Sequence, residues 1–326
     1  MAMQNIEKLR EIIDREIEQM ELASRRPNEL YLPVDYVLSN GGKRLRPVLS
    51  LLACELFSGN LASAIKPAAA IEVFHNFTLL HDDIMDKADI RRCRPTVHKK
   101  WNENTAILSG DAMMVLSYKL IAAAEREILP VLLGVFNRTA LEVCEGQQMD
   151  MNFETMPVVS EEMYLEMIRL KTSVLIAAAL EIGAVCGGAA QKDASLMYQS
   201  GLNLGMAFQI QDDLLDLYGD QEKFGKKPGG DVLLNKKTFL LVSAFEKANE
   251  QTTMRINELM EKENDPDIKV MEFKNIFDEL GIRSLAESRA ESFFNKALEK
   301  LHATSPASSR KSELMELIKT LMARKS

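Results

Sequence analysis

Cysteine, glycine and proline are all scarce in this sequence, and their scarcity excludes several classes of protein. The 326 residues include 4 Cys, 16 Gly and 10 Pro. Because the cysteines stand far apart and form no C-x-x-C pair, the sequence indicates neither a zinc site nor a disulfide framework. These cysteines are Cys54, Cys93, Cys144 and Cys186. We therefore expect a protein of the reducing cytoplasm.

An excess of positive charge and a long apolar run are also missing. The chain has 40 Lys and Arg against 48 Asp and Glu, and this acidic balance disfavours a nucleic-acid partner. The most apolar stretch, residues 174–190, contains Glu181 and is shorter than the roughly 20 apolar residues that a membrane span needs. The N-terminal segment lacks the apolar block of a signal peptide. We expect no export, no membrane span and a buried helix at 174–190.

The spacing of the apolar residues predicts the fold class. They recur at three and four residues, and no alternating β-branched run lies between turn signals, so the fold should be all-α. Breaks are short, and no linker rich in Pro, Gly or Ser divides the chain, which predicts a single domain over residues 1–326. The predicted helices cover residues 5–24, 29–40, 47–58, 61–88, 105–126, 130–151, 160–187, 191–218, 236–262, 268–302 and 311–324.

The most informative pattern is an aspartate triplet that occurs twice. Residues 82–86 read D-D-I-M-D and residues 212–216 read D-D-L-L-D, each inside an apolar helical stretch. The first and last carboxylates of each triplet are four residues apart, which on a helix places them about 5–6 Å from each other on one face. Oxygen ligands in this arrangement suit Mg²⁺. Clustered carboxylates within apolar helices repel one another unless cations neutralise them, so the repeat predicts a functional metal site.

Basic residues gather at two further places. The segment G-G-K-R-L-R-P at residues 41–47 ends one predicted helix with glycine and begins the next with proline. Lys43 and Arg46 therefore lie at a helix start, where free N–H groups favour anions. Arg91 and Arg92 follow the first aspartate motif and suit bidentate phosphate contacts. These basic and acidic residues together suit the binding of a diphosphate. The sequence contains no G-x-S-x-G or G-x-G-x-x-G motif, so it indicates neither a nucleophilic serine nor a Rossmann dinucleotide site.

In combination, these motifs resemble the trans-isoprenyl (polyprenyl) diphosphate synthase family. The resemblance rests on G-G-K-R-L-R-P, on L-L-H-D-D-I-M-D followed by R-R, and on F-Q-I-Q-D-D-L-L-D, and it runs from about Gly41 to Lys236. It implies a homodimer of helical bundles, each around a central cavity. It also implies Mg²⁺-dependent joining of isopentenyl diphosphate to an allylic diphosphate: dimethylallyl, geranyl or farnesyl. A class I terpene cyclase or a squalene-type synthase would lack the element at residues 41–47.

The resemblance implies roles for individual residues. The diphosphate of isopentenyl diphosphate is expected to be bound by Lys43, Arg46, His75 and Arg92. The allylic diphosphate is expected to be bound through three Mg²⁺ ions held by Asp82, Asp86 and Asp212, with support from Asp83, Asp213 and Asp216. Further positive charge is expected from Arg91, Lys171, Lys226 and Lys236. Lys227 and Lys237 stay open as alternatives to their neighbours.

Family positions beside the developing allylic cation match Lys171, Thr172 and Gln209. In the family, Mg²⁺ and basic groups stabilise the departing diphosphate while an apolar cavity keeps water from the carbocation. No protein general base is evident in the sequence. In the family the departing diphosphate is thought to accept the proton.

In the family, the residues four and five positions before the first aspartate help to set the product length, and here these are Thr78 and Phe77. One aromatic residue and no insertion in the motif resemble geranylgeranyl synthases, and a farnesyl diphosphate synthase is the alternative. The helix around Ala112–Ser117 is an alternative floor for the growing chain. From a different class, a non-catalytic regulatory subunit typically loses one aspartate motif, whereas both are intact here.

Overall fold

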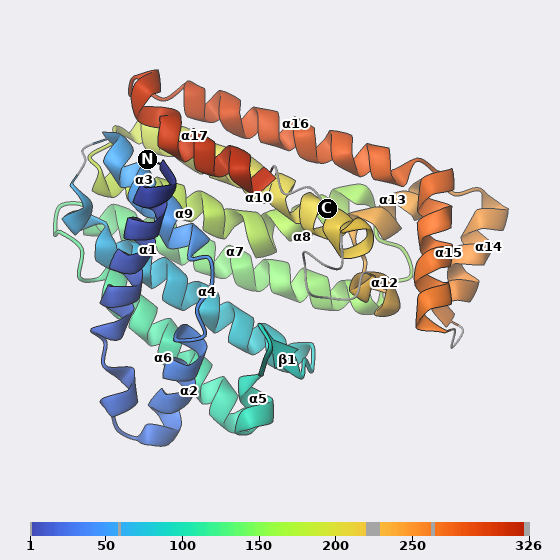
Figure 1. The fold of residues 1–326 in the computed structure, drawn as a ribbon, viewed down its shortest axis with the longest axis horizontal. Coiled ribbons are helices and arrows are strands. Elements are labelled where there is room, and N and C mark those ends of the chain that lie inside the picture. The colour runs from blue at the N-terminus through green and yellow to red at the C-terminus, as the bar shows by residue number, and fades with distance from the viewer. Residues whose placement is uncertain (1, 58–59, 220–228, 262–264, 323–326) are drawn as a thin grey trace. The chain divides into compact units, whose positions relative to one another are not determined.

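The computed structural model describes residues 2–57, 60–219, 229–261 and 265–322, and these are mostly helical (Figure 1). The all-α prediction is confirmed. The α-helices are α1 (Ala2–Glu18), α2 (Asn28–Leu38), α3 (Leu45–Phe57), α4 (Ile65–Met85), α5 (Val97–Lys100), α6 (Glu103–Ile121), α7 (Leu129–Thr155), α8 (Glu161–Ile168), α9 (Val174–Cys186), α10 (Gln191–Tyr218), α12 (Gly230–Leu233), α13 (Phe239–Lys247), α14 (Glu250–Glu261), α15 (Pro266–Glu279), α16 (Ile282–His302) and α17 (Ser308–Met322). Other helical elements are the 3-10 turns η1 (Leu22–Ser24) and η2 (Leu61–Ser63) and the π-helix η3 (Arg169–Ser173).

A small hairpin interrupts the helices, and the sequence did not predict it. Strand β1 (Ile90–Arg91) pairs antiparallel with β2 (Arg94–Pro95). The two turn residues, Arg92 and Cys93, have φ of +50° and +61°. Two-residue hairpin turns often need this left-handed backbone, for which Asn and Gly are the usual residues. Because neither is present, the segment carried no hairpin signal.

The predicted helices 236–262 and 268–302 are each divided in the structure. The predicted helix 236–262 contains α13 and α14, which are separated at Ala248, where ψ is 137°. The predicted helix 268–302 contains α15 and α16, which are separated at Gly281, where φ is +66°. Apolar spacing continues across both breaks, so periodicity alone could not locate them.

The chain divides into two compact units. The first unit comprises Met1–Arg138, Ala178–Tyr198 and Thr304–Leu314. The second unit comprises Thr139–Ala177, Gln199–Ala303 and Met315–Ser326. Each unit contains one of the two aspartate motifs. The single-domain interpretation of the sequence stays a prediction.

Helix α4 is central to the first unit, where it packs against α1, α3 and α6 (Figure 1). Helix α9 also lies close to α3, because a Cβ atom on Gly183 would come within 1.9 Å of the Ser50 carbonyl oxygen. Most α9 residues are buried, which confirms the buried helix predicted at 174–190 as far as Cys186, whereas Gly188 and Ala190 are exposed. Among the described residues, no helix combines the length and the apolar content that crossing a membrane requires.

Aromatic side chains form much of the core of the second unit. Tyr164 of α8, Phe239 of α13 and Phe273 and Phe277 of α15 are all buried there, together with Ile210 of α10. The rings of Tyr164 and Phe239 lie 6.1 Å apart in an edge-to-face arrangement. Burying one such side chain contributes about 2–3 kcal/mol to stability. This packing fixes α8 and α13 against α10, the helix that carries the second aspartate motif.

Candidate functional site

The first aspartate motif lies at the C-terminal end of α4, in the first unit. Asp82 and Asp83 belong to its last turn, and Asp86 is the C-cap residue. Asp86 is exposed and Asp82 is half-buried, whereas Asp83 is only 5% exposed. The first and last carboxylates of the motif are therefore accessible, and the middle one is directed into the protein.

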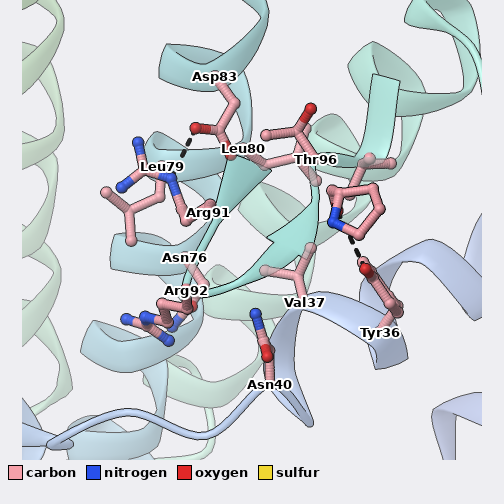
Figure 2. Close-up of a pocket in the computed structure, with 12 residues that line it drawn as sticks. Tyr36, Val37, Asn40, Asn76, Leu79, Leu80, Asp83, Arg91, Arg92 and Thr96 are labelled. Carbon is pink, nitrogen blue, oxygen red and sulfur yellow. Dashed lines mark hydrogen bonds and ion pairs between the residues drawn. The ribbon is translucent and has the colours of Figure 1, made fainter. Parts of the chain in front are cut away.

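An ion pair connects the middle aspartate to the hairpin (Figure 2). Arg91 donates from Nε to Asp83 Oδ1 at 2.6 Å. Burial raises the pKa of Asp83, and the charge of Arg91 opposes that shift. The Thr96 hydroxyl also donates to the Ala88 carbonyl at 2.6 Å, on the chain that leads from α4 to β1. These contacts position Arg91 and Arg92 beside the aspartate motif.

The basic residues assigned to isopentenyl diphosphate come together in the first unit. Arg46 Nη1 lies 3.0 Å from His75 Nε2, and Arg92 donates to the Gly41 carbonyl at 2.5 Å. Burial and the charges of Arg46 and Arg92 hold the pKa of His75 well below its usual value. The neutral ring accepts from Arg46 at Nε2, so its proton lies on Nδ1. Lys43 is exposed on the same loop.

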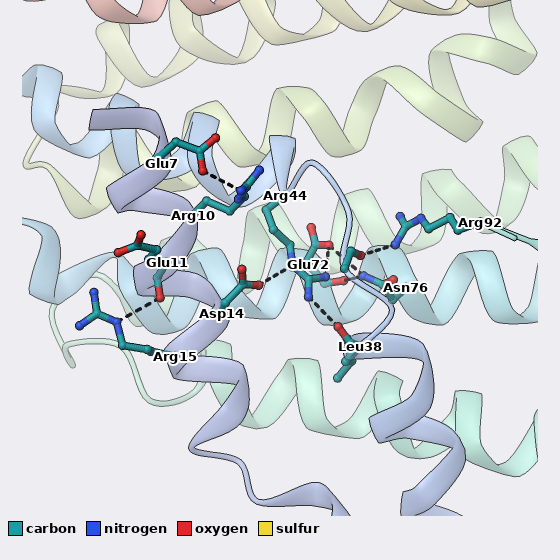
Figure 3. A network of polar contacts seen from close by, with 11 residues as sticks. Glu7, Arg10, Glu11, Asp14, Arg15, Leu38, Arg44, Glu72, Asn76 and Arg92 are labelled. Carbon is teal, nitrogen blue, oxygen red and sulfur yellow. Dashed lines mark hydrogen bonds and ion pairs between the residues drawn. The ribbon is translucent and has the colours of Figure 1, made fainter. Parts of the chain in front are cut away.

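The sequence missed the role of Arg44, which lies inside the G-G-K-R-L-R-P segment (Figure 3). Its side chain is buried and its φ is +46°. It donates to Asp14 Oδ1 at 2.8 Å, to Glu72 Oε1 at 2.9 Å and to the Leu38 carbonyl at 2.6 Å. Arg44 thus ties the loop to α1, α2 and α4 instead of facing a ligand. Nothing in the sequence separates it from its basic neighbours.

A pocket lies between α2, α4 and the hairpin (Figure 2). Polar groups in its wall already bond within the protein, since Tyr36 donates to the Pro95 carbonyl and Asn76 donates to the Glu72 carbonyl. The Tyr36 bond connects the hairpin to α2, whereas the Asn76 bond lies within α4. The pocket is lined by Tyr36, Val37, Asn40, Asn76, Leu79, Leu80, Asp83, Arg91, Arg92, Pro95, Thr96 and Val97.

The second aspartate motif lies in the last turns of α10, in the second unit. Asp212 is exposed and Asp216 is half-buried, whereas Asp213 is only 4% exposed. Asp213 Oδ2 accepts from the Tyr164 hydroxyl and from the Phe239 backbone N–H at 2.8 Å, and Oδ1 accepts from Gln209 Nε2 at 3.1 Å. Burial raises the pKa of Asp213 to about 7, against the effect of these donors. Burial, reinforced by Asp213, raises the pKa of Tyr164, so its hydroxyl keeps its proton.

The last aspartate of this motif supports the segment that carries Lys236. Asp216 Oδ2 accepts from the Asp231 backbone N–H at 3.0 Å, at the start of α12. The Asp231 carbonyl in turn accepts from the backbone N–H of Lys236 at 2.9 Å. Lys236 is exposed, whereas Lys237 lies 6.0 Å from the Phe245 ring centroid and burial lowers its pKa. Lys226 lies outside the described residues.

Lys171 and Thr172 lie in the π-helix η3, an irregularity that the sequence did not reveal. Lys171 Nζ lies 2.6 Å from Asp150 Oδ2 of α7. Thr172 Oγ1 donates to Gln209 Oε1 of α10 at 3.0 Å. The structure thus brings together Thr172 and Gln209, which the sequence assigned to one role. Single π turns inside α-helices are frequent at functional sites.

Phe77 and Thr78 lie on α4 before the first aspartate motif. The Phe77 ring lies 5.4 Å from that of Phe74 and 4.8 Å from that of His81. The Thr78 hydroxyl donates to the His75 carbonyl at 2.8 Å, within the same helix. Because α4 packs against α6, the alternative floor residues of α6 also belong to this region, and Met113 among them is buried.

The accessible carboxylates fit Mg²⁺ that binds together with a substrate. Within the described ranges, no three His, Cys, Asp or Glu side chains are grouped so that they could hold a metal ion. Mg²⁺ commonly needs only one or two carboxylates and completes its shell with water and substrate phosphates. Asp82 with Asp86, and Asp212 with Asp216, provide such carboxylates at i and i+4.

Comparisons with known proteins agree with these features. A family model described as "Polyprenyl synthetase" matches residues 27–279. The chain is 45% identical over 237 residues to the geranylgeranyl diphosphate synthase of Methanosarcina mazei, across 72% of this chain and 73% of that protein. It is 39% identical over 253 residues to the geranylfarnesyl diphosphate synthase of Natronomonas pharaonis, across 72% and 74%.

A solved structure is also similar over nearly the whole chain. The crystal structure of geranylgeranyl pyrophosphate synthetase from Pyrococcus horikoshii matches with a TM-score of 0.94 and 35% identity. The match covers 99% of this chain and 98% of that one.

Proposed function

The chain belongs to the polyprenyl synthetase family, and on that premise we propose that it is a prenyltransferase that makes geranylgeranyl diphosphate. It would join isopentenyl diphosphate to an allylic diphosphate. One observation carries the proposal: in both D-D-x-x-D helices the middle aspartate is buried and the other two are accessible. This design suits carboxylates that bind Mg²⁺ together with a diphosphate.

We assign the allylic diphosphate to the two aspartate motifs. Asp82, Asp86, Asp212 and Asp216 would supply oxygen ligands to three Mg²⁺ ions. When bound, these ions would stabilise the negative charge that develops on the departing diphosphate. Asp83 and Asp213 support the motifs from inside each unit. Arg91, Lys171 and Lys236 would add positive charge, and the assignment of Lys226 to the same role falls outside the described residues.

We assign the diphosphate of isopentenyl diphosphate to Lys43, Arg46, His75 and Arg92. The short contact between Arg46 and His75 and the contact of Arg92 with the Gly41 loop support this grouping. A neutral His75 offers one N–H donor, and the guanidinium groups offer several more. The burial of Arg44 in its own ion pairs keeps the loop that carries Lys43 and Arg46 in place.

The proposed reaction follows from charge. The allylic C–O bond breaks and its electron pair leaves with the diphosphate, after which the double bond of isopentenyl diphosphate attacks the carbocation. Loss of a proton to the departing diphosphate then restores a double bond. Because Thr172 donates its hydroxyl proton to Gln209, its oxygen lone pairs can face the cation and stabilise it. Lys171, held by Asp150, would lie beside this pair.

For the product, Phe77 and Thr78 favour a chain of four isoprene units. Phe77 lies five residues before Asp82, which on a helix is about 7.5 Å of rise. Its ring could stop a growing chain, whereas the small Thr78 would let the chain extend past that position. The relative from N. pharaonis, named geranylfarnesyl diphosphate synthase, supports a second candidate product that is one unit longer. Farnesyl diphosphate is the shorter candidate.

We further propose a homodimer in the cytoplasm. The resemblance of the motifs to the family supports the dimer. All four cysteines lie among the described residues, and the structure contains no disulfide between them. This supports a reducing compartment.

Incorporation of labelled isopentenyl diphosphate tests the proposed activity. The purified chain is incubated with each allylic starter in turn, with Mg²⁺ and then with EDTA. We expect transfer of label into a prenyl diphosphate with Mg²⁺ and none with EDTA. Inactivity with dimethylallyl, geranyl and farnesyl diphosphate alike would refute the proposal.

A further inference from the structure

A chain of hydrogen bonds in the second unit ends at Thr172. Thr172 donates to Gln209 Oε1 at 3.0 Å, and Gln209 Nε2 donates to Asp213 Oδ1 at 3.1 Å. The Tyr164 hydroxyl donates to the other oxygen, Asp213 Oδ2. Four side chains from α8, η3 and α10 are therefore joined in a row. The roles predicted from the sequence for Asp213, Gln209 and Thr172 do not involve Tyr164.

The order of donors and acceptors in this chain fixes the side-chain amide of Gln209. Asp213 accepts from Gln209 Nε2, from the Tyr164 hydroxyl and from the Phe239 N–H, so the Gln209 NH₂ group faces Asp213. Its carbonyl oxygen must then face Thr172, which makes Thr172 the donor. The rotamer of Asp213 is held at its other oxygen by the Tyr164 hydroxyl and the Phe239 N–H. The orientation of the Thr172 hydroxyl thus depends on Tyr164 and Phe239, which act through Asp213 and Gln209.

The backbone at Thr172 is held as firmly as its side chain. Two glycines on neighbouring helices leave no room for a Cβ atom against η3. A Cβ on Gly146 of α7 would come within 2.3 Å of the Lys171 nitrogen, and one on Gly205 of α10 within 2.5 Å of the Ser173 Cα. The π turn is therefore packed directly against two helix backbones, on either side of Thr172 in the sequence. With the backbone fixed, the hydroxyl direction is the remaining variable.

We infer that Tyr164 is a positioning residue for the condensation, which acts through Asp213 and Gln209 to orient the Thr172 hydroxyl. This inference rests on the proposed function, because that function places Thr172 beside the allylic cation. The ring of Tyr164 packs on Phe239, and a phenylalanine would keep that packing. Only the hydroxyl reaches Asp213, so the aromatic ring contributes stability and the hydroxyl contributes orientation.

Tyr164→Phe tests the inference, with Tyr218→Phe as the matched control. Tyr218 also donates to an aspartate, Asp278 Oδ1 at 2.8 Å, but that bond leads away from Gln209. We expect Tyr164→Phe to lower kcat about tenfold, because small displacements of a positioned group are costly, with the KM of both substrates little changed. Tyr218→Phe should retain the wild-type kcat. A Tyr164→Phe variant with wild-type kcat and only a lower melting temperature would overturn the inference.

A double-mutant cycle separates positioning from general stability. If Tyr164 acts through Thr172, the kcat of Tyr164→Phe combined with Thr172→Val should equal that of Thr172→Val alone. Independent effects that multiply in the double variant would contradict the inference.

The crystal structure of Tyr164→Phe gives a readout that does not need activity. We expect the bond between Thr172 and Gln209, 3.0 Å in the wild type, to lengthen beyond hydrogen-bonding distance. An unchanged bond would overturn the inference. If the wild type transfers no isoprene unit, the proposed function fails, and this structural comparison still decides whether Tyr164 orients Thr172.

Discussion

The two aspartate motifs share the D-D-x-x-D pattern but stabilise their middle carboxylate in different ways. In the first unit, Asp83 is neutralised by the guanidinium of Arg91, whose side chain is 36% exposed. In the second unit, Asp213 accepts hydrogen bonds from three uncharged donors on Tyr164, Phe239 and Gln209. One motif therefore relies on a charge at the surface, and the other relies on three uncharged donors, of which those of Tyr164 and Phe239 are buried.

This difference shows that the D-D-x-x-D pattern determines the arrangement of the accessible carboxylates, but not the partners of the buried carboxylate. Both helices present their first and last aspartates at i and i+4, because helical spacing alone decides that. The buried aspartate can be satisfied by whatever its surroundings supply. In the first unit, Arg91 forms the ion pair with Asp83 and therefore lies beside the motif. In the second unit, the hydrogen bonds of Asp213 connect the motif to Thr172 through Gln209.

The largest expected effect comes from removing the first aspartate of either motif. We expect Asp82→Ala and Asp212→Ala each to lower kcat on the order of a thousandfold, because each removes charge stabilisation of the departing diphosphate. Circular dichroism should show intact helix content in both. Asp278→Ala, which alters an exposed aspartate of α15, is the control and should remain active. Near-wild-type turnover in either motif variant would contradict the role of that motif.

The basic cluster of the first unit should serve one substrate only. Arg46→Ala should raise the KM for isopentenyl diphosphate about thirtyfold, since a hydrogen bond to a charged group contributes about 2 kcal/mol. The KM for the allylic partner should change little. Steady-state kinetics with each substrate varied in turn measure both values, and Arg15→Ala on the exposed part of α1 is the control. Equal effects on the two KM values would refute the separation of the sites.

Product length should respond to changes in the first unit. Phe77→Ala should yield products longer than the wild type, because the ring no longer stops the chain. Thr78→Phe should shift products toward farnesyl diphosphate, because a second aromatic ring blocks extension. Chromatography of the dephosphorylated products measures the distribution. Unchanged distributions in both variants would instead place the floor on α6, around Met113 and Met114.

The last comparison concerns stability, and it sets the two middle aspartates directly against each other. Asp213→Ala leaves three donors without an acceptor, two of them buried, so the free energy of unfolding should fall by about 3 kcal/mol. Asp83→Ala leaves Arg91, which water can solvate, so the loss should be about 1 kcal/mol or less. Urea unfolding at one fixed pH measures both. Added salt should reduce only the Asp83 effect, and equal losses for both variants would remove the contrast.

The sequence predicted the accessible face of the site better than its supporting contacts. Helical periodicity and the motifs located Asp82, Asp86, Asp212 and Asp216, and the grouping of Thr172 with Gln209 followed from the family resemblance. The partner of Asp83 was missed because Arg91 reaches it through a hairpin whose turn residues carry no turn signal. Tyr164 lies 49 residues from Asp213, so only the packing of α8 against α10 and α13 reveals their contact.

Two further features depend on tertiary packing and had no local signal. The π turn at Lys171 and Thr172 follows a continuous apolar pattern that equally fits an unbroken α-helix. Arg44 stands between Lys43 and Arg46, and only its burial against Glu72 and Asp14 distinguishes it from a phosphate ligand. In both places the backbone geometry, and not the residue type, decides what the side chain does.

The most direct test of the proposed activity is the product that the wild type makes from farnesyl diphosphate, isopentenyl diphosphate and Mg²⁺. The products are dephosphorylated and identified by mass spectrometry. We predict geranylgeraniol as the main alcohol, from one addition of an isoprene unit that ends where Phe77 meets the chain. Geranylfarnesol as the main alcohol would contradict the assigned chain length, and recovery of farnesol alone would contradict the geranylgeranyl synthase activity itself.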